Sequence, residues 1–398
     1  MKKRIFIAIH YLEIGGAEIS LIGLLNAIDT EFYDVDLFLY SHRGELLKQV
    51  PNKINLLPEI KKYDVIEKPI REAIQKGFSD IALARIWAKC QFARYAKKNQ
   101  LKEGSAILQY VFDAVTPLLP DINPNTEYDL AISFLTPHNI VLNKVKAKKK
   151  LAWIHTDYTK ISVNVEKEIK VWGQFDHIVS ISEDVTHAFL KVFPTLAGKI
   201  IRIANILSPQ TVRQKALAGK VDFSTQDGRI NLLSVGRFTF AKNFDNVPDI
   251  CRRILQEGCD VYWYIAGYGG DEHLIKEKIK EVGMENRVIL LGKQENPYPF
   301  IKGCDIYVQP SRFEGNAVTV REAQILCKPV IVANYPTAHS QIKQGVDGII
   351  VPQDNACCAH EIAQFIKNKE LQQNIVSYLK EHDYGNEKEV QKLYRLMN

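Results

Sequence analysis

The sequence lacks any apolar run long enough to cross a bilayer, and it has no low-complexity tract and no short-period repeat. A membrane-spanning helix needs about 20 consecutive apolar residues, so we expect no transmembrane segment. The apolar run at residues 5–9 is short, and Glu13 and Glu18 follow soon after it. We therefore interpret this run as a first β-strand and not as the core of a signal peptide.

Paired cysteine motifs are also missing. The seven cysteines are odd in number and contain no Cys-x-x-Cys pair. Most of them fall in predicted strands or on apolar helix faces, where a free cysteine behaves as a small hydrophobic residue. Cys357 and Cys358 are adjacent, but no cluster of histidines and cysteines accompanies them, so we expect no metal there. Free thiols favour a reducing compartment, and we expect a cytoplasmic protein.

Positive charge is in modest excess, +6 over the whole chain, and it is concentrated in two places. Residues 76–102 carry seven lysines and arginines against one aspartate, with Trp87, Phe92 and Tyr95 among them, and residues 144–150 carry five lysines. This composition suits a helix that lies on an anionic membrane surface, and a solvated helix face explains it almost as well. A nucleic-acid-binding protein is a further alternative, but no recognition-helix or aromatic-platform motif is present, so we expect no nucleic-acid partner.

Short apolar runs alternate with helix-like segments along most of the chain. This alternation predicts parallel β-sheets with helices on both faces. Strands are predicted near residues 4–9, 34–40, 129–134, 150–154, 177–181, 199–203, 230–235, 260–266, 288–291, 305–308 and 329–333.

The alternation stops in one place, at residues 205–228, which collect Pro, Gly, Ser and Asp. Because a chain of this length is expected to form two domains, we place the domain boundary there. We predict an α/β protein of two doubly wound Rossmann-like domains, 1–206 and 207–383, that face each other across a cleft. Residues 59–115 should form a helical insertion in the first domain, and a helix at 384–398 should pack back on it.

Residues 305–328 contain two glutamates, Glu314 and Glu322, with seven residues between them. A buried strand, a proline turn and a loop lead into a helix that is expected to begin near Val318. The unpaired N–H groups at such a helix start attract an anion, phosphate especially. The alternative is a capping box, in which Thr319 and Glu322 only satisfy backbone groups at the helix start, with Glu314 a solvated loop carboxylate.

Further candidate residues follow the ends of predicted strands. Gly15 and Gly16 follow the first strand, where they either let a ligand approach the backbone or simply form a tight turn. Arg237 and Lys242 follow the first strand of the second domain; two cations there suit a diphosphate, and a solvated loop is the alternative. His155 also follows a strand and is placed to meet a ligand, although a lone histidine is more often structural.

Two other motifs do not support a ligand site. The glycine run at 267–270 superficially resembles a dinucleotide fingerprint, but Glu272 stands where the third glycine should be. Asp34 and Asp36 have the spacing of a metal–nucleotide site, yet they open an amphipathic strand and no other carboxylate clusters near them. We therefore expect neither a dinucleotide nor a metal.

The spacing of Glu314 and Glu322 within SRFEGNAVTVREA resembles the Glu-x7-Glu signature of the retaining family-four glycosyltransferases of GT-B fold. The similarity covers the whole second domain, whereas the first domain matches only through the turn at Gly15 and Gly16 and through His155. The other segments that carry it are VGRFTFAKN at 235–243, IAGYGGDEHLI at 265–275, NRVILLGKQ at 286–294, VIVANYPTAHSQI at 330–342 and DGIIVP at 347–352.

The resemblance implies catalytic roles for four residues. Arg237 and Lys242 would hold the donor diphosphate, and Glu314 would grip the transferred sugar. His155 would contact that sugar from the first domain. In the front-face reaction that the family implies, the departing phosphate accepts the acceptor's proton while cations and a helix N-terminus stabilise its charge, so neither a metal nor another cofactor is needed.

Donor-binding roles are implied for the surrounding residues. Glu322 would bind the ribose hydroxyls. Asn316 and Ala317 stand where members often have Phe-Gly, and this departure changes the shape that faces the sugar. The remaining implied donor-binding residues are Gly15, Gly16, Gly292, Lys293, Val318 and Thr319, of which Gly292 and Lys293 would border the nucleobase.

The resemblance thus implies a glycosyltransferase of the hexosyltransferase type. Its donor would be a UDP-sugar and its acceptor a glycan or a polyprenyl-diphosphate-linked sugar, in the synthesis of a bacterial surface polysaccharide. A different GT-B enzyme, such as a sugar-nucleotide epimerase or a phosphorylase, is an alternative that the paired glutamates argue against. A catalytically inactive homologue is another, and the joint presence of Arg237, Lys242, Glu314 and Glu322 argues against it.

Overall fold

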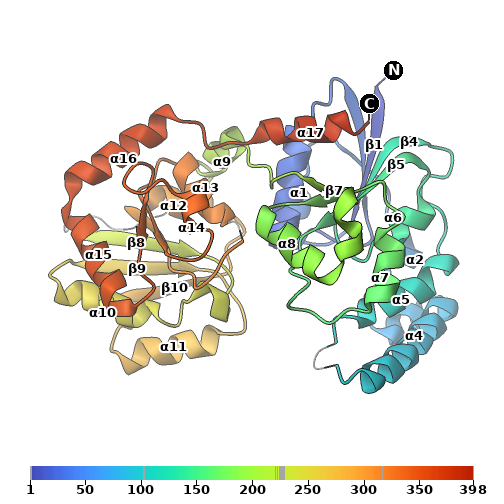
Figure 1. Cartoon of the computed structure of the whole chain (residues 1–398), viewed down its shortest axis with the longest axis horizontal. Coiled ribbons are helices and arrows are strands. Elements are labelled where there is room, and N and C mark those ends of the chain that lie inside the picture. The colour runs from blue at the N-terminus through green and yellow to red at the C-terminus, as the bar shows by residue number, and fades with distance from the viewer. Residues whose placement is uncertain are drawn as a thin grey trace. The chain divides into compact units, whose positions relative to one another are not determined.

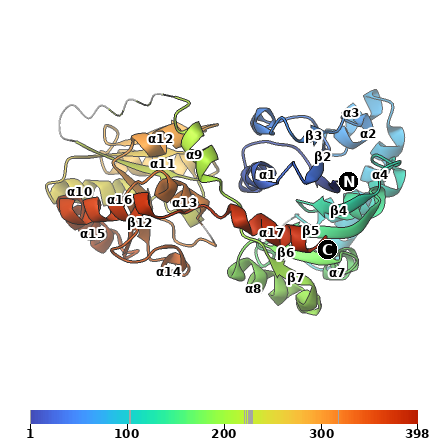
Figure 2. The same ribbon diagram turned by 90° about the horizontal axis from the view of Figure 1, so that it is seen from above.

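The chain is built from two compact units, each around a parallel β-sheet (Figures 1 and 2). The first unit comprises Met1–Ile206 together with Glu387–Asn398, and the second comprises Leu207–Asn386. The chain therefore passes between the units twice. The computed structural model describes residues 2–101, 104–219, 221, 223, 229–315 and 317–397.

The sheet of the first unit has seven strands in the order β3-β2-β1-β4-β5-β6-β7, and all neighbours run parallel. The inner strands are apolar and buried over most of their length because helices cover both faces. The strand order reverses between β1 and β4, which is where open sheets of this kind bind ligands, at the carboxyl ends of the strands. The strands are β1 Lys3–Ile9, β2 Tyr33–Leu39, β3 Asn55–Leu56, β4 Tyr128–Ser133, β5 Ala147–Ile154, β6 His177–Ser180 and β7 Ile200–Arg202.

Two hydrophobic cores lie on the two faces of this sheet. One includes Phe6 and Phe38 and extends under the helical insertion, and the other includes Ile5 and Leu37 and extends under α1. The insertion after β3 consists of α2 to α5. The helices are α1 Gly16–Ala27, α2 Lys61–Asp64, α3 Ile70–Gln75, α4 Ser79–Lys98, α5 Ile107–Val115, α6 Asn139–Lys144, α7 Val165–Trp172 and α8 Glu183–Val192.

The last helix, α17 (Val390–Arg395), completes the first unit and not the second. The Tyr394 ring stacks on Tyr33 with centroids 4.1 Å apart, and its hydroxyl accepts a hydrogen bond from the Asp29 N–H at 2.8 Å. Just before α17, Glu389 accepts a hydrogen bond from the Ala204 N–H. Figures 1 and 2 both show α17 against the first unit.

The sheet of the second unit has six parallel strands in the order β10-β9-β8-β11-β12-β13, and its order reverses between β8 and β11. Helices again cover both faces, over two further hydrophobic cores. The strands are β8 Ile230–Val235, β9 Val261–Ala266, β10 Val288–Gly292, β11 Ile306–Gln309, β12 Val330–Ala333 and β13 Ile349–Val351. The helices are α9 Pro209–Lys215, α10 Val247–Gln256, α11 Glu272–Glu281, α12 Tyr298–Gly303, α13 Val318–Ile325, α14 Ala338–Gln341, α15 Asn355–Lys367 and α16 Lys369–Glu381.

The prediction of an α/β chain with two doubly wound Rossmann-like domains is confirmed. Two edge strands, β3 and β13, were not predicted as strands; β3 has only two residues, too few for an apolar pattern to stand out, whereas β13 is as long as the predicted β7. No helix in the described part of the chain combines the length and the apolar composition that crossing a bilayer requires.

Candidate functional site

The structure brings Lys242 and Glu314 together, although they are 72 residues apart in the chain. Lys242 ends a short 3-10 turn after β8, and its Nζ lies 2.5 Å from Glu314 Oε1. The same oxygen accepts hydrogen bonds from Ser311 Oγ at 2.6 Å and Gln309 Nε2 at 3.0 Å. Gly236 makes room for the lysine, since a Cβ there would come within 3.3 Å of Lys242 Cε. The pair is thus held at the carboxyl ends of β8 and β11, next to the strand-order reversal.

Glu322 lies in a different environment from the one that a capping box requires. Helix α13 begins at Val318 after the N-cap residue Ala317, with no side-chain cap, so Glu322 stands in its second turn. Its carboxylate accepts a hydrogen bond from the Tyr298 hydroxyl at 2.9 Å and is 3% exposed. The capping-box alternative is therefore wrong. Burial raises the pKa of Glu322 to about 7, against the opposing effects of the Tyr298 hydrogen bond and the Lys215 charge.

This raised pKa predicts a pH-dependent loss of stability. Between the ordinary carboxyl pKa of 4.5 and about 7 the folded chain keeps a proton on Glu322 that the unfolded chain has released. The free energy of unfolding therefore falls through this window as the pH rises, by about 2–3 kcal/mol. Glu322→Gln should lack this contribution, so urea melts should show the variant gaining on the wild type from pH 4.5 to 7. The exposed Glu285→Gln is the control, and a constant difference for Glu322→Gln would contradict the assignment.

A backbone N–H group at the start of α13 already has a hydrogen-bond partner. The N–H of Ala317, one of the implied donor-binding residues, donates to Gln341 Oε1 at 3.1 Å in this structure. Thr319 Oγ1 donates to Gln309 Oε1 at 3.2 Å, and Val318 is the first helical residue. The predicted site residue Asn316 lies outside the described residues.

The other predicted donor-site residues of the second unit also follow strand ends. Arg237 is exposed after β8 and has no hydrogen-bond or ion-pair partner within the described residues. Gly292 ends β10 with φ +70°, a conformation that favours glycine, and its carbonyl accepts from the Gly267 N–H. Lys293 Nζ lies 5.2 Å from the centroid of the Tyr268 ring. These residues stand at the same edge of the sheet as the Lys242–Glu314 pair.

The glycine run at 267–270 has a packing role. A Cβ at Gly267 would lie 1.9 Å from the Gly236 carbonyl oxygen, and one at Gly269 would lie 2.4 Å from the Phe238 oxygen. These glycines let the loop after β9 lie directly on the loop after β8.

In the first unit, Gly15, Gly16 and His155 stand at the carboxyl edge of the sheet. Gly15 is the N-cap of α1, and a Cβ on Gly16 would meet no atom within 4 Å. His155 directly follows β5, with its ring centroid 4.7 Å from that of Phe134. Burial lowers the pKa of His155 to about 3, so the ring is neutral at physiological pH, and its buried Nε2 has no partner among the described residues.

Sequence reasoning missed a second group of polar residues on the opposite face of this sheet from His155. His10 directly follows β1 and Tyr40 directly follows β2, with ring centroids 4.8 Å apart, and His138 follows β4. Nε2 of both histidines and the Tyr40 hydroxyl are buried without a partner in the described residues, while His10 Nδ1 is bonded to Glu67. His10 and Tyr40 could have been predicted by the feature that singled out His155, which is a polar ring immediately after a strand.

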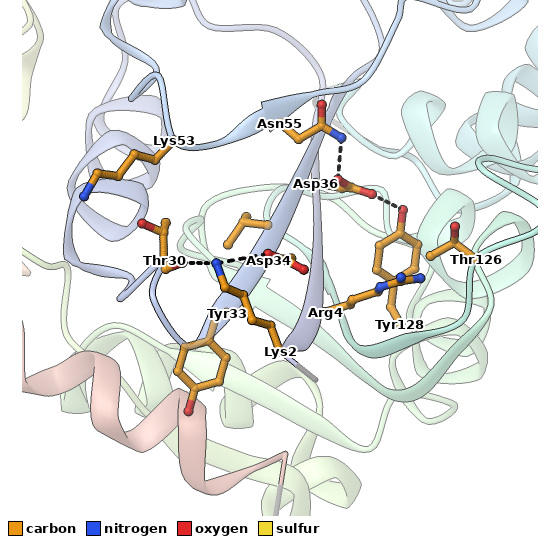
Figure 3. Close-up of a pocket in the computed structure, with 11 residues that line it drawn as sticks. Lys2, Arg4, Thr30, Tyr33, Asp34, Asp36, Lys53, Asn55, Thr126 and Tyr128 are labelled. Carbon is orange, nitrogen blue, oxygen red and sulfur yellow. Dashed lines mark hydrogen bonds and ion pairs between the residues drawn. The ribbon is translucent and has the colours of Figure 1, made fainter.

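A surface pocket of about 570 Å³ lies at the other end of the same strands (Figure 3). Lys2, Arg4 and Asp34 line it, close to the amino ends of β1 and β2, and Lys2 Nζ lies 3.6 Å from Asp34. Asp36 accepts hydrogen bonds from Asn55 and the Tyr128 hydroxyl. This pocket is therefore at the opposite edge of the sheet from the predicted site residues. Among the described residues no group of three His, Cys, Asp or Glu side chains is placed to hold a metal ion.

Comparison with known proteins identifies the second unit. Residues 220–382 match the family model described as glycosyl transferases group 1. The second unit is a group 1 glycosyltransferase domain. It holds the Lys242–Glu314 pair, Arg237 and Glu322, so the residues that carry the resemblance fall within the family match.

Two curated relatives match part of this chain over part of their own length. The amylovoran biosynthesis glycosyltransferase AmsD of Erwinia amylovora is 26% identical over 179 residues, 44% of this chain and 50% of that protein. The N-acetylgalactosamine-N,N'-diacetylbacillosaminyl-diphospho-undecaprenol 4-alpha-N-acetylgalactosaminyltransferase of Campylobacter jejuni is 29% identical over 152 residues, 38% of this chain and 40% of that protein. The chain spans half or less of the length of these curated relatives.

The fold is similar over both units to that of solved glycosyltransferases. The crystal structure of HepE from Anabaena, in complex with UDP, superposes with a TM-score of 0.63 at 16% identity and covers 99% of each chain. The predicted GT-B fold is confirmed by this likeness and by the two parallel sheets.

Proposed function

We propose that this protein is a retaining, metal-independent glycosyltransferase that moves a sugar from a UDP-sugar to a hydroxyl of a glycan or lipid-linked acceptor. The observation that carries the proposal is the Lys242–Glu314 pair beside the start of α13, within a group 1 glycosyltransferase domain. A cation, a carboxylate and a helix N-terminus at the carboxyl edge of a sheet are the groups that a sugar diphosphate requires.

Each charged residue then has a task in the transfer. The bond between the sugar's anomeric carbon and the diphosphate oxygen breaks, and negative charge develops on the leaving UDP. Lys242 and Arg237 stabilise that charge, and the departing phosphate takes the proton of the attacking hydroxyl as the new glycosidic bond forms on the same face. Glu314 Oε2, which has no partner among the described residues, accepts a hydrogen bond from the transferred sugar.

The other site residues position the donor. Glu322 accepts hydrogen bonds from the ribose hydroxyls once the donor is bound, and Gly292 and Lys293 border the base. Within the first unit, neutral His155 has a buried Nε2 without a partner among the described residues, and a Cβ on Gly16 would meet no atom within 4 Å.

The donor and the acceptor class are proposed from the relatives. HepE was crystallised with UDP, and the Campylobacter jejuni relative is named for a diphospho-undecaprenol-linked sugar. Together with the amylovoran biosynthesis glycosyltransferase AmsD, these relatives favour a role in bacterial surface polysaccharide synthesis on the cytoplasmic side of the membrane.

A thermal-shift panel tests the donor proposal. UDP-glucose, UDP-galactose and UDP-N-acetylglucosamine are compared with GDP- and ADP-glucose, each with and without EDTA. A donor at 100 times its Kd stabilises the fold by about 2.7 kcal/mol, so at least one UDP-sugar should raise Tm by several degrees. Stabilisation only by a GDP- or ADP-sugar would contradict the UDP preference, and loss of the shift in EDTA would contradict metal independence.

We also propose that the insertion brings the enzyme to an anionic membrane surface. The exposed residues of α4 recur at helical spacing, so they share one face along the helix. This face is apolar at the start of the helix and basic at its end. That face consists of Leu83, Ile86, Trp87, Cys90, Arg94, Lys97 and Lys98. The three basic residues of this face have no ion-pair partner among the described residues; Lys102, also in the predicted basic segment, lies outside them.

The second basic run, residues 144–150, does not form such a surface. Three of its lysines face aspartates, which offset their charge, and the ammonium groups of the other two are directed to backbone carbonyls. The partners are Asp121 for Lys144, Pro124 O for Lys146, Asp129 for Lys148, Asp176 for Lys149 and Leu142 O for Lys150.

Trp87→Ser should weaken membrane binding at least fivefold. Trp87 is 58% exposed, and its ring would be buried among the lipid headgroups next to the cations of α4. Co-sedimentation with phosphatidylglycerol vesicles at low salt measures the effect. Phe32→Ser removes an aromatic ring that is 65% exposed elsewhere on the first unit and should change nothing. Wild-type protein that stays in the supernatant would contradict membrane association.

A further inference from the structure

Two phenylalanines are exposed directly beside the Lys242–Glu314 pair. Phe240 begins the 3-10 turn that ends at Lys242, and Phe313 precedes Glu314 in the chain. Phe240 is 65% exposed and Phe313 is 46% exposed, and their ring centroids lie 6.5 Å apart. Because aromatic rings are ordinarily buried for most of their area, a close exposed pair marks a contact surface.

Arg312 contacts the Phe240 ring and joins the loops that carry the two rings. Its guanidinium forms two hydrogen bonds with the Asp245 carboxylate, at 2.9 and 2.7 Å, and donates to the Phe240 carbonyl at 2.6 Å. Its plane also lies over the Phe240 ring, with Cζ 4.1 Å from the centroid. The bidentate ion pair thus fastens the loop that carries Phe313 to the loop that carries Phe240, so the rings are held in position before any ligand arrives.

The two neighbours Phe313 and Glu314 face different surroundings. The Glu314 carboxylate is turned inward to Lys242, Ser311 and Gln309, and its side chain is 10% exposed, whereas the Phe313 ring is turned to solvent. The rings therefore face a molecule that approaches from solvent, and not the sugar that Glu314 holds. In the proposed transfer reaction, the approaching molecule is the acceptor.

The charge of this rim indicates the chemistry of its ligand. Asp245 neutralises Arg312, so the two rings present an apolar and uncharged surface. A pyranose ring offers a matching surface, since the C–H groups of its face are apolar while its hydroxyls point to the edges. Because Arg312 is already paired with Asp245, it leaves no free positive charge beside these rings for an anionic headgroup or a phosphate.

We propose that Phe240 and Phe313 form an aromatic rim that binds the pyranose ring of the acceptor and holds its hydroxyl toward the Lys242–Glu314 pair. The proposal rests on the proposed function and extends it to the residues that recognise the acceptor. Both phenylalanines act as positioning residues for the attacking sugar. Their contribution is expected in the acceptor KM far more than in donor binding.

The test uses the full chain, the UDP-sugar that it hydrolyses fastest, and methyl glycosides of glucose, galactose, N-acetylglucosamine and N-acetylgalactosamine as acceptors. Methyl glycosides are chosen because they carry no aromatic group of their own to stack on the rim. UDP release with and without each glycoside gives the acceptor KM, and saturation-transfer NMR reports glycoside binding without turnover. In the wild type at least one glycoside should accelerate UDP release over donor hydrolysis.

Phe240→Leu should raise the acceptor KM about tenfold, because stacking on an aromatic face is lost while an apolar side chain remains. Phe240→Tyr keeps the ring and should restore most of the wild-type KM, and Phe313→Leu should behave like Phe240→Leu. The control is Phe32→Leu, which changes an equally exposed phenylalanine in the first unit.

Three results would overturn the proposal. One is a loss in donor hydrolysis as large as the loss in acceptor KM, which would mean that the rings act on the donor or on the chain itself. Another is an unchanged acceptor KM in both leucine variants, and the third is a wild type that neither binds nor responds to any of the glycosides. A wild type that hydrolyses no sugar nucleotide at all would instead count against the proposed function.

Discussion

Lys242→Met lowers kcat by about 100- to 1,000-fold and changes the donor KM by less than a factor of three. The lysine is held 2.5 Å from Glu314, where the proposed reaction develops negative charge on the leaving UDP. Removing one preorganised group that stabilises such charge costs about 100- to 1,000-fold in turnover. Methionine is close to lysine in side-chain length and volume, so the packing of residue 242 against Gly236 is kept. Steady-state UDP release at saturating acceptor measures the effect.

A second lysine of the same unit serves as the control for Lys242→Met. Lys276 lies on α11, where it pairs with Glu272 on an exposed helix face, so Lys276→Met should leave kcat within a factor of two. A rise in donor KM with unchanged kcat would show that Lys242 only binds the donor. Small and equal changes in both constants would remove Lys242 from the site altogether.

Glu322→Ala should weaken donor binding about 50-fold while kcat at saturating donor falls less than fivefold. In the proposed site the variant loses the acceptor of the ribose hydroxyls, and each hydrogen bond lost is worth about 0.5–1.5 kcal/mol. Titration calorimetry with UDP measures the change directly, because UDP carries the ribose but not the transferred sugar.

Tyr298→Phe separates the two roles of Glu322. The alanine variant also leaves the buried Tyr298 hydroxyl without its 2.9 Å partner, which costs stability on its own. Tyr298→Phe breaks the same hydrogen bond but keeps the carboxylate, so it should lower Tm without a comparable loss of UDP affinity. Equal losses of affinity in both variants would mean that Glu322 acts only through the packing of α12 and α13.

Much of the fold was predictable because the inner strands are buried on both faces. β1 reads as an apolar run from Ile5 to Ile9 and β12 as one from Val330 to Ala333 for that reason, and their periodic neighbours read as helices. The edge strand β3 was missed because two residues carry no pattern, and β13 was missed although it is as long as the predicted β7. Their place in each sheet is set by parallel pairing with β2 and β12.

The site was predictable only in part. The residues after each strand could be located, and the spacing of Glu314 and Glu322 pointed to a donor site. The contact between Lys242 and Glu314 could not be foreseen from the spacing alone, because it depends on β8 and β11 being neighbours in the sheet. The choice between a capping box and a buried glutamate likewise depended on where α13 begins, a matter of one or two residues.

Some residues carry no signal that separates function from packing. His10 and His155 occupy equivalent positions after strands, yet only His155 matched a family pattern. Once folded, both show a buried Nε2 without a partner in the described residues. That property depends on which helices cover each histidine, and no local pattern encodes it.

The position of α17 has a consequence for truncated forms of this protein. Deletion of residues 387–398 would remove a segment that follows the second unit, yet the damage would fall on the first unit, whose Tyr33 would lose its stacking partner. The second unit is a single uninterrupted stretch, whereas the first is closed by the end of the chain. During translation, all residues of the second unit are therefore synthesised before the residues that complete the first unit.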